Sequence, residues 1–446
     1  NQRREPRKAS GGRRRGWGPA ANQVKMAQTV TTAAEATGLF GWWRVAPPAA
    51  RRALVAAALG WMLDAFDVML YSMVLSSLVP ALGMTMGTAG LLGSLTLVAS
   101  AVGGLIFGVV ADRYGRTRAL IASILIYSVF TFACGLSQNV LQLAIFRVLL
   151  GLGMGGEWAS GAALVSETWP AAHRGKALGF MQSAWAVGFA SAAAVTALVL
   201  PRWGWRAVFF VGILPAFFTI WVRRRVEEPE IWRQARAAPA SSRGRFSDIF
   251  RGSLGRLTLV VTLMNACTMF AWWGFNLWLP GYLSLSAKSG GIGLSVQVMS
   301  GMVFVMQIGM WFGYVTFGFI SDVIGRKRSY VIYLVTAAVL ILAYTATTNV
   351  WLLLALGPIV AFFATGYFSG FGAVTAEIYP TDIRATAQGF TYNIGRLASA
   401  VAPYAVGRLA QTEGFAAALS ISAAAFVLAA VTWIWIPETR GRQLTT

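Results

Sequence analysis

The sequence repeats itself at a constant spacing of 210 residues. The segment GVVADRYGRTR begins at Gly108, and the similar segment GFISDVIGRKR begins at Gly318. A second pair keeps the same spacing: SETWPAAHRGKALGF begins at Ser166 and AEIYPTDIRATAQGF begins at Ala376. Two different pairs of segments at one spacing indicate that the chain contains two copies of one structural unit. Any fold for this chain must therefore contain an internal duplication.

Each copy is made of apolar segments that are long enough to cross a lipid bilayer. Hydrophobic residues make up 57% of the 446 residues and charged residues only 12%, whereas roughly a quarter of the residues in a soluble chain are charged. The apolar residues gather in runs of about 20, which as helices span a hydrocarbon core ~30 Å thick. The sequence therefore predicts an all-α polytopic membrane protein embedded in a lipid bilayer.

The polar segments divide the chain into twelve predicted transmembrane helices, arranged as two six-helix repeats. A basic segment at 1–52, expected to be cytoplasmic and disordered, precedes the first bundle at 53–222. A cytoplasmic linker at 223–256 leads to the second bundle at 257–436, and a cytoplasmic tail follows at 437–446. The predicted spans are 53–79, 89–111, 119–137, 140–167, 177–200, 206–222, 257–283, 296–321, 329–347, 350–376, 385–408 and 413–436.

The basic residues indicate how these spans are oriented. If the N-terminus is inside, 31 of the 37 Lys and Arg residues lie on the cytoplasmic side. Such a bias predicts that both termini are cytoplasmic, in the inner or plasma membrane of the cell. It also accounts for the net charge of +21 as a topology signal, so that no nucleic-acid partner is expected.

The duplicated loops place charges and glycines at helix ends. Asp112 and Asp322 are expected to face neighbouring helix termini, and Gly108 and Gly318 would permit close approach. Paired with basic and acidic partners, these groups form a predicted latch that closes the cytoplasmic side while the outside is open. The alternative is that they only cap helices and fix topology. The predicted cytoplasmic gate comprises Gly108, Asp112, Arg113, Gly115, Arg116, Glu167 and Arg174 in the first copy, and Gly318, Asp322, Gly325, Arg326, Glu377 and Arg384 in the second.

The G-x-x-x-D-R-x-G-R segment, its second copy and the six-plus-six repeat resemble the major facilitator superfamily over about residues 50–440. Finer features resemble its sialate:proton and aromatic acid:proton symporters. These are the acids of GWMLDAFDVML in the first span, the Arg and Glu of RVLLGLGMGGEWASGAALVSETWP in the fourth, and GFTYN in the eleventh. Arg396 in GRLASA is closer to the aromatic-acid branch. The resemblance implies a carrier of organic anions.

Charged residues inside the predicted spans point to proton coupling. A charge at the bilayer centre costs at least about 2.5–3.5 kcal/mol, so each one needs a reason. Asp64 and Asp67 are three residues apart and share one face of the first span. Burial and mutual repulsion both favour the protonated form of at least one of them. Glu157 lies ~15 Å from the inner end of the fourth span, at a depth close to that of Asp64. The predicted proton-coupling residues are therefore Asp64, Asp67 and Glu157, and hydrogen bonding between helices is the alternative role.

A second set of polar and aromatic residues forms the predicted substrate site. Arg396 can hold a carboxylate by two parallel hydrogen bonds, and Asn393 lies one turn before it in the same span. Arg147 is expected close to Asp67, where it binds either the acid or an anion. The alternatives are a static ion pair that holds the first and fourth spans together for Arg147, and pairing with backbone carbonyls or with another span for Arg396. Predicted neighbours in the pocket are Trp273, Asn276 and Gln307.

Other classes of function lack support in the sequence. It contains no nucleophile–base set, metal-ligand cluster or phosphate-binding P-loop, so neither an enzyme, a metal site nor an ATP-driven carrier is expected. The prediction is a monomeric secondary transporter, driven by the proton gradient without any other cofactor. It would carry a small organic acid, whether a monocarboxylate, a sialate-like acid or an aromatic carboxylate, together with protons by alternating access. Sugar or polyol symport, proton-driven drug efflux and a non-transporting membrane sensor are the alternatives.

Overall fold

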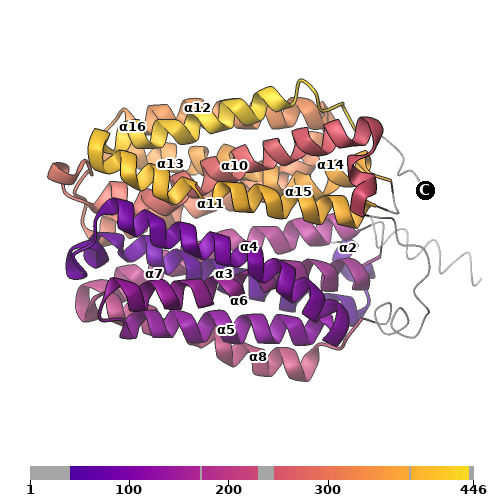
Figure 1. Cartoon of the computed structure of the whole chain (residues 1–446), viewed down its shortest axis with the longest axis horizontal. Helices are drawn as coiled ribbons and strands as arrows, with labels where there is room; N and C mark the ends of the chain where they lie inside the picture. Colours follow the sequence, from indigo (N-terminus) through magenta and orange to yellow (C-terminus); the bar gives the residue numbers. More distant parts are fainter. Residues whose placement is uncertain (1–40, 171–172, 230–245, 381–382, 441–446) are drawn as a thin grey trace, which may run out of the picture. The chain divides into compact units, whose positions relative to one another are not determined.

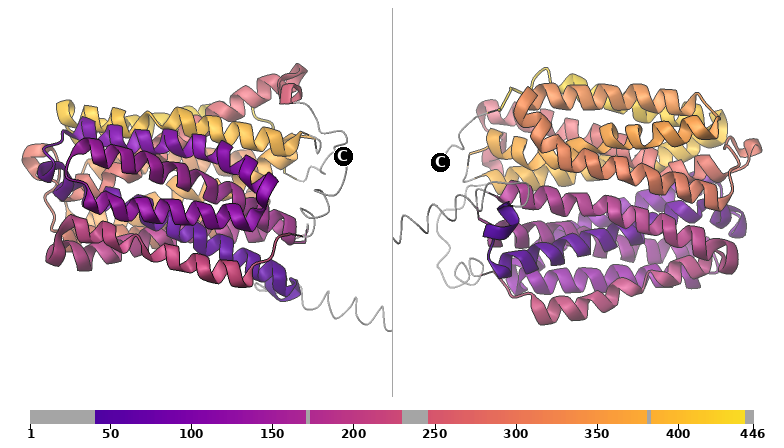
Figure 2. Two further views of the ribbon diagram at one scale, coloured as in Figure 1. Left: turned by 60° about the horizontal axis from the view of Figure 1, so that its bottom comes forward. Right: turned by 180° about the vertical axis from the view of Figure 1, so that it is seen from behind.

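The computed structural model describes residues 41–170, 173–229, 246–380 and 383–440. Its contacts form one compact unit ending at Pro47, of which the described part holds helix α2 (Gly41–Val45), and a second unit that begins at Pro48. All regular structure in the described residues is helical (Figures 1 and 2). Most of the predicted basic segment, the middle of the predicted linker and the end of the predicted tail lie outside these residues. The predicted domain boundaries therefore stay predictions.

The first half of the second unit contains six helical elements. α7 has a non-helical backbone at Gly204, where φ is 75°, so it consists of two helices. Glycine adopts this conformation without steric cost, and the break falls between the fifth and sixth predicted spans. The elements are α3 (Pro48–Ala81), α4 (Met86–Tyr114), α5 (Arg116–Leu136), α6 (Val140–Thr168), α7 (Arg174–Val211) and α8 (Leu214–Arg225).

The second half follows the same order with two interruptions. The predicted span at 350–376 is divided by a short 3-10 helix, η3, that begins and ends with glycine, a poor helix former. The span predicted at 385–408 is interrupted between Ser399 and Ala402, because Pro403 has no backbone N–H to donate to the carbonyl of Ser399, four residues earlier. The elements are η1 (Phe246–Phe250), α10 (Gly252–Ser284), η2 (Ala287–Ser289), α11 (Val296–Ile324), α12 (Arg326–Thr345), α13 (Val350–Thr365), η3 (Gly366–Gly370), α14 (Phe371–Ile378), α15 (Arg384–Ser399) and α16 (Ala402–Thr432).

The number of spans agrees with the predicted fold. The described residues contain ten helical stretches that are long and apolar enough to cross a membrane. Two of them, 174–222 and 386–432, are each two helices joined at a glycine, Gly204 or Gly414. Dividing these two gives the twelve predicted spans. The helices of each half lie together with nearly parallel axes, and the two groups lie side by side (Figures 1 and 2).

Glycines let helices of one half pack backbone against backbone. A Cβ atom added to Gly103 of α4 would lie 2.1 Å from the carbonyl oxygen of Leu152 in α6. One added to Gly155 of α6 would lie 2.0 Å from the carbonyl oxygen of Ser100. Such close packing of small residues drives association in a membrane, where no hydrophobic effect separates helix from lipid.

Two glutamates that the sequence analysis did not single out complete the duplicated loops. Glu228 accepts hydrogen bonds from the backbone N–H groups of Thr117 and Arg118, at 3.2 Å each. Glu438, which is 210 residues further on, accepts from Arg326 at 2.9 Å and from Lys327 at 3.1 Å. Each carboxylate therefore caps the N-terminus of α5 or α12, where unpaired N–H groups favour negative charge.

The glycine of each duplicated loop makes room for this cap. Gly115 has φ of 118° and Gly325 has φ of 101°, a region that other residues rarely adopt. A Cβ atom at Gly115 would lie 2.3 Å from an oxygen of Glu228, and one at Gly325 would lie 2.7 Å from an oxygen of Glu438. Backbone conformation and carboxylate packing therefore both require glycine.

The α4–α6 contact predicts a difference between two glycines of one helix. Gly103→Ala forces a methyl group against the Leu152 carbonyl and should cost about 1–3 kcal/mol of stability, as overpacking does. Gly108→Ala is the matched control, because no heavy atom lies within 4 Å of its Cβ position. The measurement is the thermal unfolding temperature of each variant in detergent. Equal unfolding temperatures for both variants would contradict the tight contact.

The Glu438 cap predicts a pH dependence. Burial opposes ionisation of Glu438, but the backbone N–H groups of Arg440, Arg326, Lys327 and Thr439 outweigh it and hold its pKa below the usual value. The stabilisation is therefore present above the unfolded glutamate pKa of about 4.3 and is lost as the pH falls through the lower folded pKa.

Glu438→Gln should accordingly lower the unfolding temperature at neutral pH. The difference from the wild type should begin to shrink near pH ~4.3, the pKa of an ordinary glutamate, and should vanish once the pH falls below the lower folded pKa of Glu438. The exposed Glu413, changed to Gln, is the control and should leave the unfolding temperature unchanged. A difference for Glu438→Gln that persists into acid would show that its charge does not act in this way.

Candidate transport site

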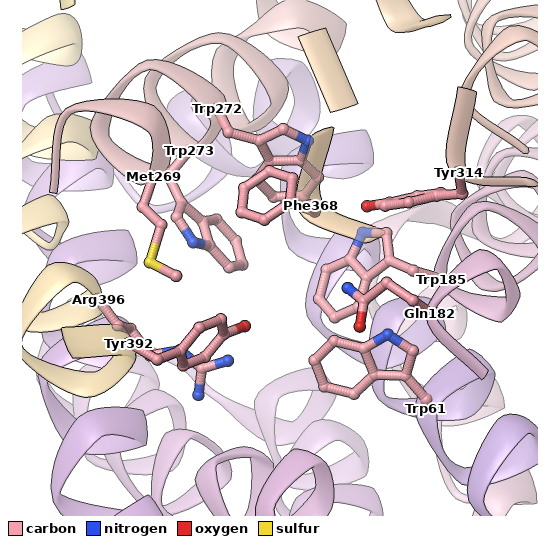
Figure 3. A pocket seen from close by; sticks show the side chains of 10 residues that line it. All are labelled: Trp61, Gln182, Trp185, Met269, Trp272, Trp273, Tyr314, Phe368, Tyr392 and Arg396. Carbon is pink, nitrogen blue, oxygen red and sulfur yellow. The ribbon is translucent and has the colours of Figure 1, made fainter. Parts of the chain in front are cut away.

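A cavity of about 370 Å³, open to solvent, is lined by residues of both halves (Figure 3). This figure includes open solvent at the mouth, so the space enclosed by side chains is smaller. Helices α3, α7, α10, α11 and α15 and the short helix η3 contribute side chains. The lining residues are Trp61, Gln182, Trp185, Met269, Trp272, Trp273, Tyr314, Phe368, Tyr392 and Arg396.

Four tryptophans form most of the apolar wall. The ring of Trp185 lies 4.7 Å from Trp61, 5.7 Å from Trp272 and 6.2 Å from Trp273, measured between ring centroids. The last two contacts are edge-on, and they join α7 of the first half to α10 of the second. Aromatic rings pack against other rings in stacked or edge-to-face geometry.

Arg396 is the one charged residue that lines the cavity. Its side chain is buried, with 4% of the residue exposed, and its guanidinium lies 5.3 Å from the Tyr392 ring centre. Nη1 donates a hydrogen bond of 3.1 Å to Oγ of Ser100, in α4 of the other half. A guanidinium has five N–H donors, and this is the one hydrogen bond that the described residues give it. Arg396 therefore has donors left for a carboxylate in the cavity.

The three predicted proton-coupling acids lie together in the interior of the first half. Asp64 and Asp67 are each 1% exposed, and Glu157 is fully buried. Asp64 interacts electrostatically with Asp67, with Glu157 and, across the two halves, with Arg396. The Glu157 carboxylate packs against Gly60, whose added Cβ would lie 2.1 Å from Oε1. Buried acids at such short range require a proton or a counter-charge.

Arg147 lies outside the cavity lining. Its guanidinium is buried and stacks on the ring of Tyr71, 4.1 Å from the ring centre. The described residues include no ion pair between Arg147 and Asp67. Arg147 makes no contact with the cavity that would support its predicted role in substrate binding, so this role stays a prediction.

The predicted amide residues are turned toward their own helices. The side-chain N–H of Asn276 donates to the carbonyl of Trp272 at 3.1 Å, and that of Gln307 donates to Val303 at 3.2 Å. Asn393 donates to the carbonyl of its own helix one turn back, at 2.9 Å. None of the three is among the lining residues, whereas the predicted Trp273 is.

Most of the wall was missed by the sequence analysis. Trp61, Trp185, Met269 and Phe368 lie in apolar runs, where a core residue and a ligand contact have the same pattern. Gln182 corresponds to Tyr392 at the repeat spacing of 210 residues. A prediction that either residue lines the cavity would therefore have pointed to the other.

The duplicated loops form equivalent ion pairs within each half. Arg116 contacts Glu167 at 2.9 Å, and Arg326 contacts Glu377 at 3.1 Å. Arg326 also pairs with Asp322 at 2.5 Å. These contacts support the loop conformation in each half, and none of them joins the two halves.

The remaining predicted gate residues take several positions. Arg113 is exposed, Arg174 is partly buried, and Nε of Arg384 donates to the Tyr379 carbonyl at 3.2 Å. The side chain of Asp112 lies outside the described part of the structure. The proposed latching action of the loops therefore stays a prediction.

The two halves are packed closely at the end opposite the duplicated loops. A Cβ atom at Gly90 of α4 would lie 2.3 Å from the carbonyl oxygen of Pro403 in α16. Nearby, the backbone N–H of Tyr404 donates to Oγ of Ser94 at 3.2 Å. Contacts between α4 and α16 thus hold the two halves together at this end.

The end that carries the duplicated loops is packed less closely. The Cβ positions of Gly108 and Gly318 have no heavy atom within 4 Å, so the predicted close approach at these glycines is not made in this state. Between this end and Arg396, the rings of Trp158 in α6 and Tyr392 in α15 stack with centroids 4.3 Å apart and planes at 6°. This stack joins the two halves one helical turn from Arg396.

Comparison with known proteins identifies the family. The sequence model of the major facilitator superfamily matches residues 57–291 and 261–445. A putative metabolite transport protein of Haemophilus influenzae is 35% identical over 91% of this chain and 98% of its own length. A probable 4-methylmuconolactone transporter of Cupriavidus pinatubonensis is 34% identical over 90% of this chain and 94% of its own length.

Further comparisons agree with this assignment. The sialic acid transporter NanX of Escherichia coli is 31% identical over 86% of this chain and 93% of its own length. The crystal structure of a D-xylose–proton symporter has the same fold, with a TM-score of 0.72 and 20% identity over 88% of this chain and 99% of its own. The predicted fold and the predicted likeness to organic-anion carriers are thus confirmed. The chain belongs to the major facilitator superfamily and is a multi-pass membrane transporter, not an enzyme.

Proposed function

We propose that this protein is a secondary active transporter that carries a small organic carboxylate together with a proton by alternating access. The observation that carries the proposal is the single guanidinium, Arg396, in a cavity otherwise walled by aromatic and neutral side chains. An arginine holds a carboxylate by two parallel hydrogen bonds, and the tryptophans provide contact for its apolar body. Relatives named for sialic acid and 4-methylmuconolactone support an organic acid as substrate.

The position of Asp64 supports the proposed proton coupling. This acid lies one helical turn from Trp61, which lines the cavity, and it interacts electrostatically with Arg396. Ionised Asp64 and a substrate carboxylate therefore compete for the field of the same guanidinium. When the substrate binds, a proton on the acid cluster restores the balance of charge. A neutral loaded complex reorients through the bilayer at lower electrostatic cost than a charged one.

The other buried acids complete the proposed coupling site. Asp67 and Glu157 share the electrostatic environment of Asp64 and share the coupled proton. Arg147, stacked on Tyr71, supplies a counter-charge when the acids are ionised in another state of the cycle.

The proposed orientation follows from the basic loops. The duplicated loops face the cytoplasm, both termini are cytoplasmic, and the protein works as a monomer in the inner or plasma membrane. In that orientation the close packing of α4 on α16 lies on the outer side, so the state described above is inward-facing. The ion pairs of the duplicated loops, with Asp112, close the cytoplasmic side in the opposite state.

Substitution of Arg396 tests the carboxylate site. Arg396→Lys keeps the charge but loses the two-pronged geometry, so the affinity for a bound acid should fall about tenfold. Arg396→Gln should lower it about a hundredfold, as expected for loss of a charge-assisted bond. Binding is measured by calorimetry and by quenching of tryptophan fluorescence. Arg408→Gln, at an exposed position, is the control. Wild-type affinity in both Arg396 variants would remove this residue from the site.

Substitution of the paired acids tests the coupling. In Asp64→Asn with Asp67→Asn, the carrier loses its proton acceptors, so accumulation driven by an imposed pH gradient should fall to background. Exchange of labelled for unlabelled acid, which needs no net proton movement, should continue in part. Proteoliposomes with purified protein give both measurements. Accumulation at the wild-type level in the double variant would assign coupling to other residues.

A further inference from the structure

The cavity has a second polar region, away from Arg396. Gln182 of α7 and Tyr314 of α11 line the opposite side, and the hydroxyl of Tyr314 points into the cavity (Figure 3). The side chains of Gln182 and Tyr314 lie near each other in this region. Both are neutral, and Tyr314 is almost fully buried. The cavity therefore offers one positive end and one end with neutral donors and acceptors.

The internal duplication explains why only one end is charged. At the spacing of 210 residues, Gln182 corresponds to Tyr392, and Ala186 corresponds to Arg396. Ala186 is buried and carries no polar group. The first half thus places an amide where the second has a phenol, and a methyl group where the second has a guanidinium. A symmetric site would hold two anionic groups, but this one has a partner for a single anion.

We propose that Gln182 and Tyr314 form a distal subsite that selects acids with one carboxylate and a neutral hydrogen-bonding group, such as a hydroxyl, at the other end. Acids with two carboxylates are rejected. This inference rests on the proposed function, since it takes Arg396 as the anchor of the first carboxylate. It adds the residues that set how many charges the substrate carries.

The chemistry of the subsite favours a hydroxyl in particular. A hydroxyl both donates and accepts, so it bonds to the Tyr314 oxygen and the Gln182 amide together. A second carboxylate would lose its hydration and meet no cation, which neutral dipoles compensate poorly. An apolar end costs less, because it removes no charge from water. A hydroxyl should therefore improve affinity about tenfold, well below the discrimination seen where buried polar groups are left unpaired.

Three flat acids of similar size test the subsite: benzoate, 4-hydroxybenzoate and terephthalate. Binding to the full-length wild-type protein is measured by calorimetry at about pH 7.5, where carboxyl groups are ionised. We expect 4-hydroxybenzoate to bind about tenfold more tightly than benzoate, and terephthalate to bind at least about tenfold more weakly than benzoate.

Two substitutions assign the selectivity to the named residues. Tyr314→Phe removes the hydroxyl and keeps the ring, so the ratio of the affinities for 4-hydroxybenzoate and benzoate should fall close to one. Gln182→Lys adds a cation opposite Arg396, so the affinity for terephthalate should rise at least about tenfold. Gln411→Lys makes the same change at an exposed position outside the cavity and should leave all three affinities unchanged. The unfolding temperature of each variant shows that it is folded.

The outcomes separate the subsite from the proposed function. If 4-hydroxybenzoate and terephthalate bind the wild type equally, or if Tyr314→Phe keeps the wild-type ratio, the subsite is overturned while the carboxylate anchor stands. If none of the three acids binds the wild type and Arg396→Gln leaves binding of other organic acids unchanged, the proposed function itself fails. Gain of terephthalate binding in Gln182→Lys alone supports the assignment directly.

Discussion

The cost of placing an ion in a bilayer governs where charge occurs in this protein. Most basic residues lie outside the predicted spans, whereas Asp64, Asp67, Arg147, Glu157 and Arg396 inside them are buried in the protein interior. The acids of the first half, Asp64, Asp67 and Glu157, lie within electrostatic reach of one another. Arg396 of the second half reaches across to Ser100 and to the field of Asp64. A membrane interior makes these interactions strong because little water screens them. The chemistry of the protein is therefore concentrated where the two halves meet.

The duplication supplies a symmetric framework, and the function depends on departures from it. Gly115 with Glu228, and Gly325 with Glu438, are the same turn and cap made twice. Structural constraints of this kind apply equally to both halves. The cavity is not symmetric in this way, because the residue that corresponds to Arg396 in the first half is an alanine, Ala186. A protein built from two copies thus obtains a polar axis across its centre, with acids on one side and a cation on the other.

The sequence predicted the fold because both of its signals are local. Long apolar runs and paired loop segments need no knowledge of tertiary contacts, and the twelve spans and the family followed from them. It predicted Arg396 and Trp273 at the cavity, because a charged or aromatic residue in a polar stretch of a span stands out. It missed Trp61 and Trp185, since a tryptophan that packs and one that lines a cavity look alike along the chain. Packing decides which face of each helix lies against the other helices. The spacing of apolar residues along these spans does not predict that face.

The stack of Trp158 on Tyr392 has a consequence for timing. A ring that turns about its side-chain bonds moves in about nanoseconds, whereas the rocking of helical bundles takes microseconds to milliseconds. In the state described here, two such rings join the halves between Arg396 and the loop end, where the glycines make no close approach. Under the proposed function, a bound molecule that leaves toward the loop end would need only a fluctuation of this aromatic pair. The slow step of each turnover would then be the return of the unloaded bundles, which involves every helix.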